Sequence, residues 1–531
     1  MAQLSFKGKT FVQNHHLLVK YHELVPLKKK SLTDKVSLHD NLIIHGDNLK
    51  GLKALLPLYA GKVKCVYIDP PYNTGNENWA YNDSVNSPMM QDWLGKVVDR
   101  EDLTRHDKWL CMMMPRLKLL RELLSEDGMI CISIDDTEIA RLVCLLDEVF
   151  GEGNKEEIIC WRRRHNQPND KSKPIAKVAE FIVTYAKNLE YLKRSKGFHG
   201  IPLTGSFSNP DNDPRGDWAS KPWKAGTGQT GTRYVITSPT GGKLEEEWLG
   251  TVETYNALRA DGRIYFPKSG GGFPRKKYFK SEREEEGQCA NNFWGHEDFG
   301  SNQEASNELG ELQLDFDNPK PTRLIKGVLQ IFSHPDSIIL DSFAGSGTTA
   351  HSVMALNAED SGNRKFILVE CEDYADSLTA ERVRRVIKGV PTAKDEALKK
   401  GLGGTFSFFE LGKSIELESI LDGESLPTYK ELARYVFYTA TGEEFDEKAI
   451  DEDTRFIGES KNYQAFLFYE PDIEKLKNLA LTLDMAKALP PLKKDKRRLV
   501  FAPTKYLDQD HLDQYRIDFA QLPFEIYERA R

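Results

Sequence analysis

The chain contains two stretches in which apolar runs alternate with segments of helical periodicity. Each apolar run has the length of a buried strand, and the segments between the runs repeat apolar residues at helical spacing. The first stretch covers about 41–151 and is followed by two further strand-like runs before residue 187, and the pattern resumes near 316. Such alternation predicts an α/β fold with a doubly wound, mostly parallel sheet.

One apolar run, VKCVYI at 63–68, is followed by four residues of unusual composition: Asp69, Pro70, Pro71 and Tyr72. Prolines cannot extend a sheet ladder, so they close the strand. The tetrapeptide then lies at the carboxyl end of the strand, where open α/β sheets bind their ligands. Further along, we expect a helix that ends at Gly128 and a strand at 129–136.

The middle of the chain has a different character. From about 190 to 315, glycine and proline become frequent, helical periodicity fades, and aromatic residues alternate with basic ones. These features predict an inserted module of strands and loops, which would suit contacts to base edges and phosphates. For its tryptophans, core packing is favoured over base contact. The tryptophans in question are Trp218, Trp223 and Trp294.

These patterns predict five parts of the chain. They are an N-terminal segment (1–40), the first half of the α/β domain (41–190), the insert (191–315), the second half of the α/β domain (316–402) and a smaller C-terminal α/β domain (403–531). Within the last part, 471–489 has the spacing of a helix, between strand-like runs.

Composition narrows the class of protein without fixing its function. The 531 residues are more than one core usually holds, and no apolar run approaches the ~18 residues of a membrane span. The first residues lack the apolar core of a signal peptide, so we expect a cytoplasmic protein. The seven cysteines show no paired CxxC spacing, so no metal site is predicted. A net charge of −8 argues against indiscriminate nucleic-acid binding, although a locally basic groove remains compatible with it.

The tetrapeptide at 69–72 has the groups needed to hold a planar base that carries an amino group. The Asp69 carboxylate and the Pro70 carbonyl can accept the two amine hydrogens, while Tyr72 stacks on the ring. That arrangement draws the nitrogen lone pair out of conjugation and directs it at an electrophilic methyl group. The prolines keep the turn stiff and remove a competing donor. A proline turn without a function is the alternative, and the second motif disfavours it.

The second motif is a glycine-rich loop between a predicted strand and a predicted helix. Its residues are Asp341, Ser342, Phe343, Ala344, Gly345, Ser346, Gly347, Thr348 and Thr349. The glycines let a ligand approach the backbone, and Glu370, at the end of the next strand, can accept hydrogen bonds from ribose hydroxyls. The lysine of a triphosphate loop and the third glycine of a dinucleotide loop are both missing. A nucleoside cofactor without a pyrophosphate remains, and S-adenosyl-L-methionine fits.

The two motifs together resemble those of amino-methyltransferases that act on DNA. Residues 69–72 match the catalytic motif of these enzymes and 343–347 match their cofactor motif. The catalytic motif comes first and an insert separates the two, as in the β-ordered class. Longer stretches, among them IDPPYNTGNENWAYND and FDNPKPTRLIK, resemble the modification subunit of Type III restriction–modification systems over about 40–400.

The resemblance implies a site-specific DNA adenine-N6 methyltransferase that uses S-adenosyl-L-methionine, flips adenine out of double-stranded DNA and transfers the methyl group directly. The insert would be the target-recognition domain, and the loop at 73–105 would close over the base. Lys320 and Pro321 would belong to the cofactor-side motif. Asp47 would contact the adenine ring of the cofactor and Glu370 its ribose, with helix capping an equal alternative for Asp47. A homodimer and a restriction subunit are the partners that the resemblance implies.

Two other functions remain open from the sequence. Cytosine-N4 methylation uses the same amine geometry, although the resemblance favours adenine because the first motif residue, Asp69, is an acid. A non-catalytic subunit that recognises DNA for a nuclease is the second alternative, and the intact motifs argue against it.

Overall fold

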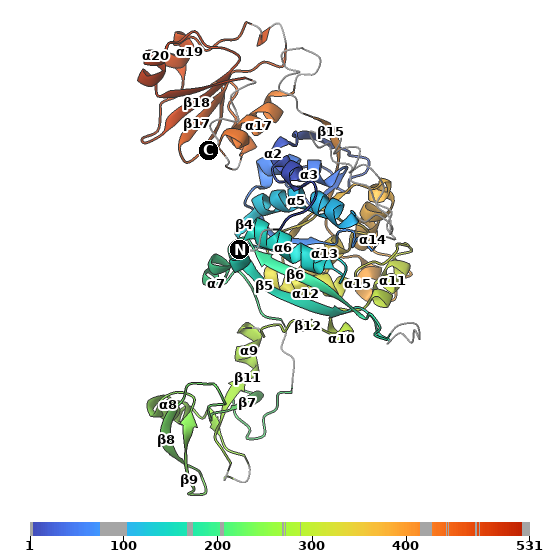
Figure 1. Cartoon of the computed structure of the whole chain (residues 1–531), viewed down its shortest axis with the longest axis vertical. Helices are drawn as coiled ribbons and strands as arrows, with labels where there is room; N and C mark the ends of the chain where they lie inside the picture. The colour runs from blue at the N-terminus through green and yellow to red at the C-terminus, as the bar shows by residue number, and fades with distance from the viewer. Residues whose placement is uncertain are drawn as a thin grey trace. The chain divides into compact units, whose positions relative to one another are not determined.

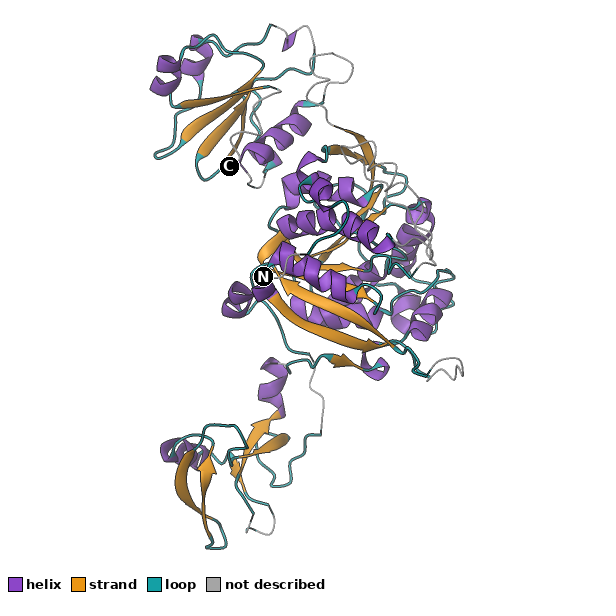
Figure 2. Cartoon of the chain, viewed as in Figure 1, coloured by secondary structure: helices purple, strands orange, loops and turns teal. Residues whose placement is uncertain are grey.

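The computed structural model describes residues 4–74, 104–166, 174–201, 206–267, 270, 272–286, 288–414, 427–441, 443, 445–472, 475–476 and 478–522. The chain forms two compact units (Figures 1 and 2). The larger unit comprises Met1–Phe198 and Asn292–Arg531, and the smaller unit comprises His199–Asn291. The loop expected to close over a base, 73–105, lies mostly outside the described residues.

A ten-stranded sheet organises the larger unit. Its strands, in spatial order, are β1 (His22–Pro26), β15 (Ser407–Ser414), β2 (Leu42–His45), β14 (Lys365–Glu370), β13 (Ile338–Asp341), β3 (Val63–Ile68), β4 (Leu124–Ile134), β6 (Ala179–Ala186), β5 (Lys155–Arg162) and β12 (Phe293–Trp294). The strands from β15 to β4 are mutually parallel, whereas β6 is antiparallel to both of its neighbours. β3 is buried along its whole length and β14 from its second residue onward, as their continuous apolar runs require.

Helices cover both faces of this sheet. The connections β2–β3 and β3–β4 run toward one edge, through α3 (Asn48–Tyr59) and α5 (Arg105–Leu123). The connections β13–β14 and β14–β15 run toward the other edge, through α13 (Thr348–Asp360) and α14 (Glu381–Lys388). Right-handed crossovers therefore place the two helix pairs on opposite faces, with the reversal of direction between β3 and β13. The predicted doubly wound, mostly parallel α/β fold is confirmed.

The remaining helices of the larger unit complete these layers. α6 (Ile139–Phe150) packs on α5, and α12 (Thr322–Phe332) packs on α13. Shorter helical segments are α1 (Lys9–Val12), α2 (His15–Leu18), η1 (Glu152–Asn154), α7 (Leu189–Ser195), α10 (His296–Phe299), α11 (Asn302–Glu311), η2 (Asp373–Ala375), η3 (Asp376–Ala380) and α15 (Glu396–Lys400).

The helix expected to end at Gly128 is shorter than predicted. α5 ends at Leu123, because Leu124 already pairs with Val63 of β3 and begins β4. The ammonium group of Lys64 donates to the Asp127 backbone oxygen (2.6 Å) and carboxylate (2.8 Å), which holds this segment in the strand. Tertiary pairing thus overrides the helical spacing of the sequence.

The C-terminal part of the larger unit carries a four-stranded sheet of β16 (Phe456–Glu459), β17 (Tyr463–Leu467), β18 (Arg497–Ala502) and β19 (Ile517–Gln521). Its helical segments are α17 (Tyr429–Thr441), η4 (Glu447–Ala449), α19 (Leu483–Ala488) and α20 (Gln509–Gln514). The continuous helix predicted over 471–489 is wrong. Leu481 forms a bridge with Lys505, and the Thr482 side chain caps α19 by accepting from the Met485 amide.

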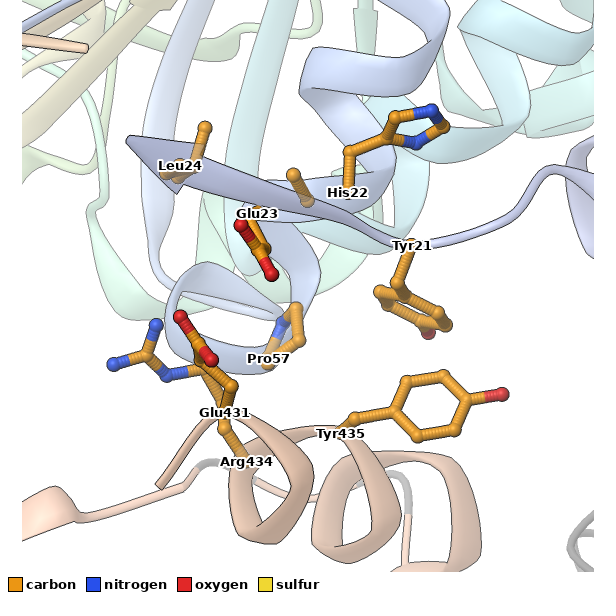
Figure 3. Close-up of a pocket in the computed structure, with 9 residues that line it drawn as sticks. Tyr21, His22, Glu23, Leu24, Pro57, Glu431, Arg434 and Tyr435 are labelled. Carbon is orange, nitrogen blue, oxygen red and sulfur yellow. The ribbon is translucent and has the colours of Figure 1, made fainter. Parts of the chain in front are cut away.

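A pocket lies where this C-terminal part meets the N-terminal segment. Figure 3 shows Tyr21 facing Tyr435 of α17, and their ring centroids are 4.7 Å apart. Glu23 and Pro57 line the same pocket. Pro57 belongs to the last turn of α3, a helix that starts at the carboxyl edge of the sheet, so this pocket is at the opposite end of α3 from the predicted site.

The smaller unit contains β7 (Trp218–Pro222), β10 (Ile264–Tyr265) and β11 (Arg275–Phe279) in one sheet, and β8 (Thr232–Thr237) with β9 (Lys243–Trp248) in another. Its helices are α8 (Val252–Ala260) and α9 (Lys280–Glu286). Trp218 and Trp223 are buried here, and Trp294 is buried in the larger unit, where it stacks on Phe299. Core packing of the three tryptophans is confirmed.

The predicted boundaries between the parts of the chain differ from the structure in two places. The predicted insert, 191–315, is wider than the smaller unit, because β12, α10 and α11 belong to the larger one. β15 lies beyond the predicted boundary at 403 yet pairs with β2 in the large sheet. Among the described residues, no helix is long and apolar enough to span a membrane.

Candidate active site

The two sequence motifs meet at the carboxyl edge of the large sheet. Asp69 directly follows β3, and Asp341 is the last residue of the neighbouring β13. Two buried side-chain oxygens at these strand ends, Oδ1 of Asp69 and Oγ of Ser342, have no hydrogen-bond partner among the residues that the structure describes. Buried polar atoms normally have partners, so this pair of atoms marks a place for a polar ligand.

Lys320 pairs with the Asp69 carboxylate. Its ammonium group donates to Oδ2 at 2.7 Å, from the segment that precedes α12. Burial raises the pKa of Asp69, and the charge of Lys320 opposes that rise. One carboxylate oxygen is therefore held by a cation, while the other is left available for a donor. Lys320, predicted to lie on the cofactor side, thus contacts the tetrapeptide at 69–72, and Pro321 occupies the N-cap position of α12.

A buried acid on β6, Glu180, extends this cluster. Its carboxylate lies 3.5 Å from the Lys320 ammonium, and it accepts a hydrogen bond from the Tyr72 hydroxyl at 3.2 Å. Arg163 donates to the other Glu180 oxygen at 2.5 Å. Burial disfavours the charge of Lys320, but Asp69 and Glu180 outweigh it and raise the pKa of Lys320. The result is a row of alternating charges in which two acids and two bases balance.

Sequence reasoning did not identify Glu180 or Arg163 as site residues. The available signal was a single acid at the start of an otherwise apolar run, EFIVTYA at 180–186, and an earlier run of three arginines at 162–164. An acid in a strand normally faces solvent, yet Glu180 is 3% exposed. Its position became visible only when the antiparallel pairing of β6 with β4 was known.

Hydrogen bonds fix the turn formed by the tetrapeptide. The indole of Trp109 donates to the Pro71 carbonyl at 2.7 Å, while the Pro70 carbonyl accepts no hydrogen bond from the described residues. Asn73, which has a positive φ of 60°, donates from its amide to the buried Glu138 carboxylate at 2.6 Å. His106 hydrogen-bonds to the same carboxylate. The turn is held from both ends, and the Pro70 oxygen stays free to accept.

The glycine-rich loop is held by its own acid. Asp341 accepts from the Phe343 amide at 3.0 Å and from the Thr349 hydroxyl at 2.5 Å. Burial raises the pKa of Asp341 to about 7, against these two hydrogen bonds. Gly345 and Gly347 have φ values of 49° and 78°, which side chains disfavour. Ala344, Ser346 and Thr348 complete the loop and are buried.

Glu370 joins the loop to the next strand. It is 5% exposed, and its two oxygens accept from the backbone amides of Gly345 at 2.6 Å and Glu372 at 3.0 Å. Burial raises the pKa of Glu370 against these bonds. Each carboxylate oxygen retains a second lone pair, so the side chain can still accept from a hydroxyl.

Asp47 acts as a helix cap. Its Oδ1 accepts from the Lys50 amide at 3.0 Å, at the start of α3. The capping reading is confirmed, whereas a contact with a cofactor ring stays a prediction. The next residue, Asn48, donates to the Ser342 carbonyl at 3.0 Å and accepts from Arg116. These bonds bring the start of α3 against the glycine-rich loop.

A fully buried arginine lies behind the loop. Arg382 of α14 donates to the hydroxyls of Ser346 (3.1 Å) and Thr348 (2.8 Å). Its other nitrogen lies 3.2 Å from His351 Nδ1 and 3.7 Å from a Glu308 oxygen. Burial lowers the pKa of Arg382 to about 10, and Glu308 opposes that change. Arg382 therefore ties the loop to α11, α13 and α14.

Comparison with known proteins agrees with this arrangement. A family model described as DNA methylase, covering N6 and N4 methyltransferases, matches residues 63–381, from β3 to α14. The StyLTI Mod subunit of a Type III restriction-modification enzyme from Salmonella typhimurium is 34% identical over 430 residues, covering 76% of this chain and 65% of that protein. The EcoPI Mod subunit from Escherichia phage P1 is 31% identical over 455 residues, covering 72% of this chain and 67% of that protein.

A shorter relative is also similar. The Type II methyltransferase M.KpnI from Klebsiella pneumoniae is 30% identical over 368 residues, covering 65% of this chain and 83% of its own. The chain spans about two thirds of the length of the two Type III subunits. The matched residues include both motifs and the strands that carry them. The chain belongs to the DNA methylase family of N6 and N4 methyltransferases.

Proposed function

We propose that the chain is a site-specific DNA adenine-N6 methyltransferase that uses S-adenosyl-L-methionine as methyl donor. The main support for this proposal is that the two carboxylate oxygens of Asp69 have different surroundings. Lys320 holds Oδ2 at 2.7 Å, while Oδ1 is buried and accepts no hydrogen bond from the described part of the chain. A buried acceptor that the protein leaves unused costs free energy unless a ligand donor reaches it. An exocyclic amine has two such donors.

The tetrapeptide binds and orients that amine. Asp69 Oδ1 accepts one amine hydrogen and the free Pro70 carbonyl accepts the other, which turns the nitrogen lone pair away from the ring. Tyr72 stacks on the base, with its hydroxyl held by Glu180 at 3.2 Å. No covalent intermediate forms, because the amine nitrogen is itself the nucleophile. Holding the amine and the methyl group in line lowers the activation free energy of the transfer, because the two groups are already oriented.

The residues at the neighbouring strand end fit the methyl donor. Bound there, S-adenosyl-L-methionine supplies an electrophilic methyl group. The open backbone around Gly345 and Gly347 admits its amino-acid portion, Ser342 Oγ offers an unused buried oxygen, and Glu370 accepts from a ribose hydroxyl. Asp47 contributes an acid at the adjacent turn, since the Gly46 amide donates to the Glu370 carbonyl at 2.9 Å. The site lies where a flipped base and the donor can meet.

Product analysis tests the proposal. The full chain is incubated with methyl-labelled S-adenosyl-L-methionine and mixed-sequence duplex DNA, and the nucleosides are separated after digestion. N6-methyladenine is the expected product. Labelled DNA that contains no N6-methyladenine would contradict the proposal.

Cytosine-N4 methylation is the second candidate function, and it is supported by the breadth of the matching family, which covers both amines. The Asp69 and Pro70 acceptors suit either one. The same digest separates the candidates, because N4-methylcytosine and N6-methyladenine elute apart.

We further propose that the chain acts in a restriction–modification system in the cytoplasm, as a homodimer and with a restriction subunit. The support is the similarity to two proteins named as Mod subunits of Type III restriction-modification enzymes. The smaller unit is proposed as the target-recognition domain. Light scattering of the purified chain, with and without duplex DNA, measures the proposed dimer.

A further inference from the structure

The strands β7 and β11, labelled in Figure 1, belong to the sheet β10–β11–β7 of the smaller unit, and the two faces of this sheet carry different side chains. On one face Lys277 is 4% exposed and forms ion pairs with Asp211 (2.5 Å) and Asp213 (2.9 Å). Its ammonium also lies 5.0 Å from the centroid of the Trp218 ring. The lysine on this face is therefore neutralised and packed, as the interior of a small unit requires.

The opposite face brings two lysines together. Lys276 of β11 lies directly opposite Lys221 of β7 in the antiparallel register, so their side chains share one face. Lys221 is exposed and Lys276 half-buried, and neither forms an ion pair with a carboxylate of the described residues. Like charges directly opposite one another destabilise a sheet. A pairing of this kind is useful where an anion binds between the two ammonium groups.

Tyr278 supplies a platform between these cations. Its ring centroid lies 5.1 Å from the Lys276 ammonium, 5.6 Å from that of Lys221 and 4.8 Å from the guanidinium carbon of Arg283 on α9. The Tyr278 hydroxyl forms no hydrogen bond with the residues that the structure describes. Cation–π contacts keep the three basic groups clustered in advance of binding.

We propose that this face, formed by Lys221, Lys276 and Tyr278, binds the phosphate backbone of duplex DNA. Lysine, arginine and tyrosine side chains are common donors to DNA phosphates, and such contacts fix register without reading sequence. The polyanion relieves the repulsion between Lys221 and Lys276. The proposal rests on the proposed DNA substrate and adds to it which surface of the smaller unit meets the backbone.

Salt dependence of binding tests this face directly. Each phosphate contact contributes about 0.9 to the slope of log affinity against log salt. The double variant Lys221→Gln/Lys276→Gln should lower the slope measured with a labelled mixed-sequence duplex by roughly 1.8. The control is Lys243→Gln, an exposed lysine on β9 in the other sheet of the same unit, which should leave the slope unchanged.

A charge-reversal variant separates binding from folding. Lys276→Glu replaces a like-charge pair by an opposite-charge pair with Lys221, so its melting temperature should equal or exceed that of the wild type while DNA binding weakens. Methyl transfer by the control Lys243→Gln should equal that of the wild type at every salt concentration. An unchanged slope in the double variant, or an equal loss in Lys243→Gln, would overturn the proposal. If the wild type bound DNA but transferred no methyl group, the proposed function would fail while the slope still tested this face.

Discussion

Two opposing influences act on the side chain of Asp69. Burial raises its pKa and so disfavours the ionised form that, in the proposed function, accepts an amine hydrogen, whereas the Lys320 ammonium at 2.7 Å lowers the pKa. Lys320 in turn depends on Glu180, which lies 3.5 Å away. The function of the acid therefore depends on side chains from two other segments of the chain, β6 and the residues before α12.

Replacement of Lys320 tests this dependence. In Lys320→Met the pKa of Asp69 rises further, because burial acts without its counter-charge. The acidic limb of the kcat/KM profile should therefore move to higher pH, and the rate at pH 7 should fall about tenfold or more as orientation is lost. Lys320→Arg retains the charge and should keep the limb closer to the wild-type position.

Lys64→Met provides the matched control for that experiment. Lys64 also forms a buried ion pair, with Asp127 at 2.8 Å, near the amino end of β3, away from the motif loops. Its loss should reduce stability without moving the limb. An unshifted profile in Lys320→Met would show that Lys320 does not set the ionisation of Asp69.

At the scale of elements, the site depends on how loops and helices are locked together behind the strand ends. The parallel strands and the two motif loops could be predicted from sequence, because continuous apolar runs and turn residues report local structure. The antiparallel direction of β6 could not, because it depends on pairing with β4. For the same reason, the sequence did not distinguish Glu180 from an ordinary strand residue. Likewise, the spacing over 471–489 predicted one helix, although Leu481 pairs with Lys505.

Arg382 links α14 to the glycine-rich loop, and we expect this link to support cofactor binding. Arg382→Met removes donors to Ser346 and Thr348, so the glycine-rich loop should lose its fixed shape and S-adenosyl-L-methionine should bind about tenfold more weakly. Equilibrium dialysis or calorimetry measures this affinity.

Arg364→Met is the matched control for Arg382→Met. Arg364 is also buried, but it contacts Ser333 and Asp360 away from the loop. Both variants lose stability, and only Arg382→Met should lose cofactor affinity. Equal affinities in the two variants would contradict the assigned role of Arg382.

At the scale of the whole molecule, we expect methyl transfer and target recognition to be divided between the two units. The larger unit carries both motif loops, and the smaller unit is inserted between the strands that bear them. The two ends of the insert are paired, since the backbone amides and carbonyls of Ile201 and Gln288 exchange hydrogen bonds of 2.8 and 2.9 Å. The insert can therefore be cut out at a point where its ends already meet.

A variant in which a short glycine–serine turn replaces 202–287 tests this division. The larger unit retains its own core, so S-adenosyl-L-methionine affinity should stay within about threefold of the wild type. Methylation of duplex DNA should be lost, because the proposed recognition surface is gone. Retained site-specific methylation would show that the smaller unit does not choose the target.

We propose that Asp69 holds the target amine of adenine and takes no part in binding the methyl donor. The most direct measurement compares wild type with Asp69→Ala for labelled N6-methyladenine in duplex DNA and, in parallel, for S-adenosyl-L-methionine affinity. We predict N6-methyladenine with the wild type, none above background with Asp69→Ala, and cofactor affinities within about threefold of each other. N6-methyladenine formed by Asp69→Ala, or a collapse of its cofactor affinity, would contradict the account.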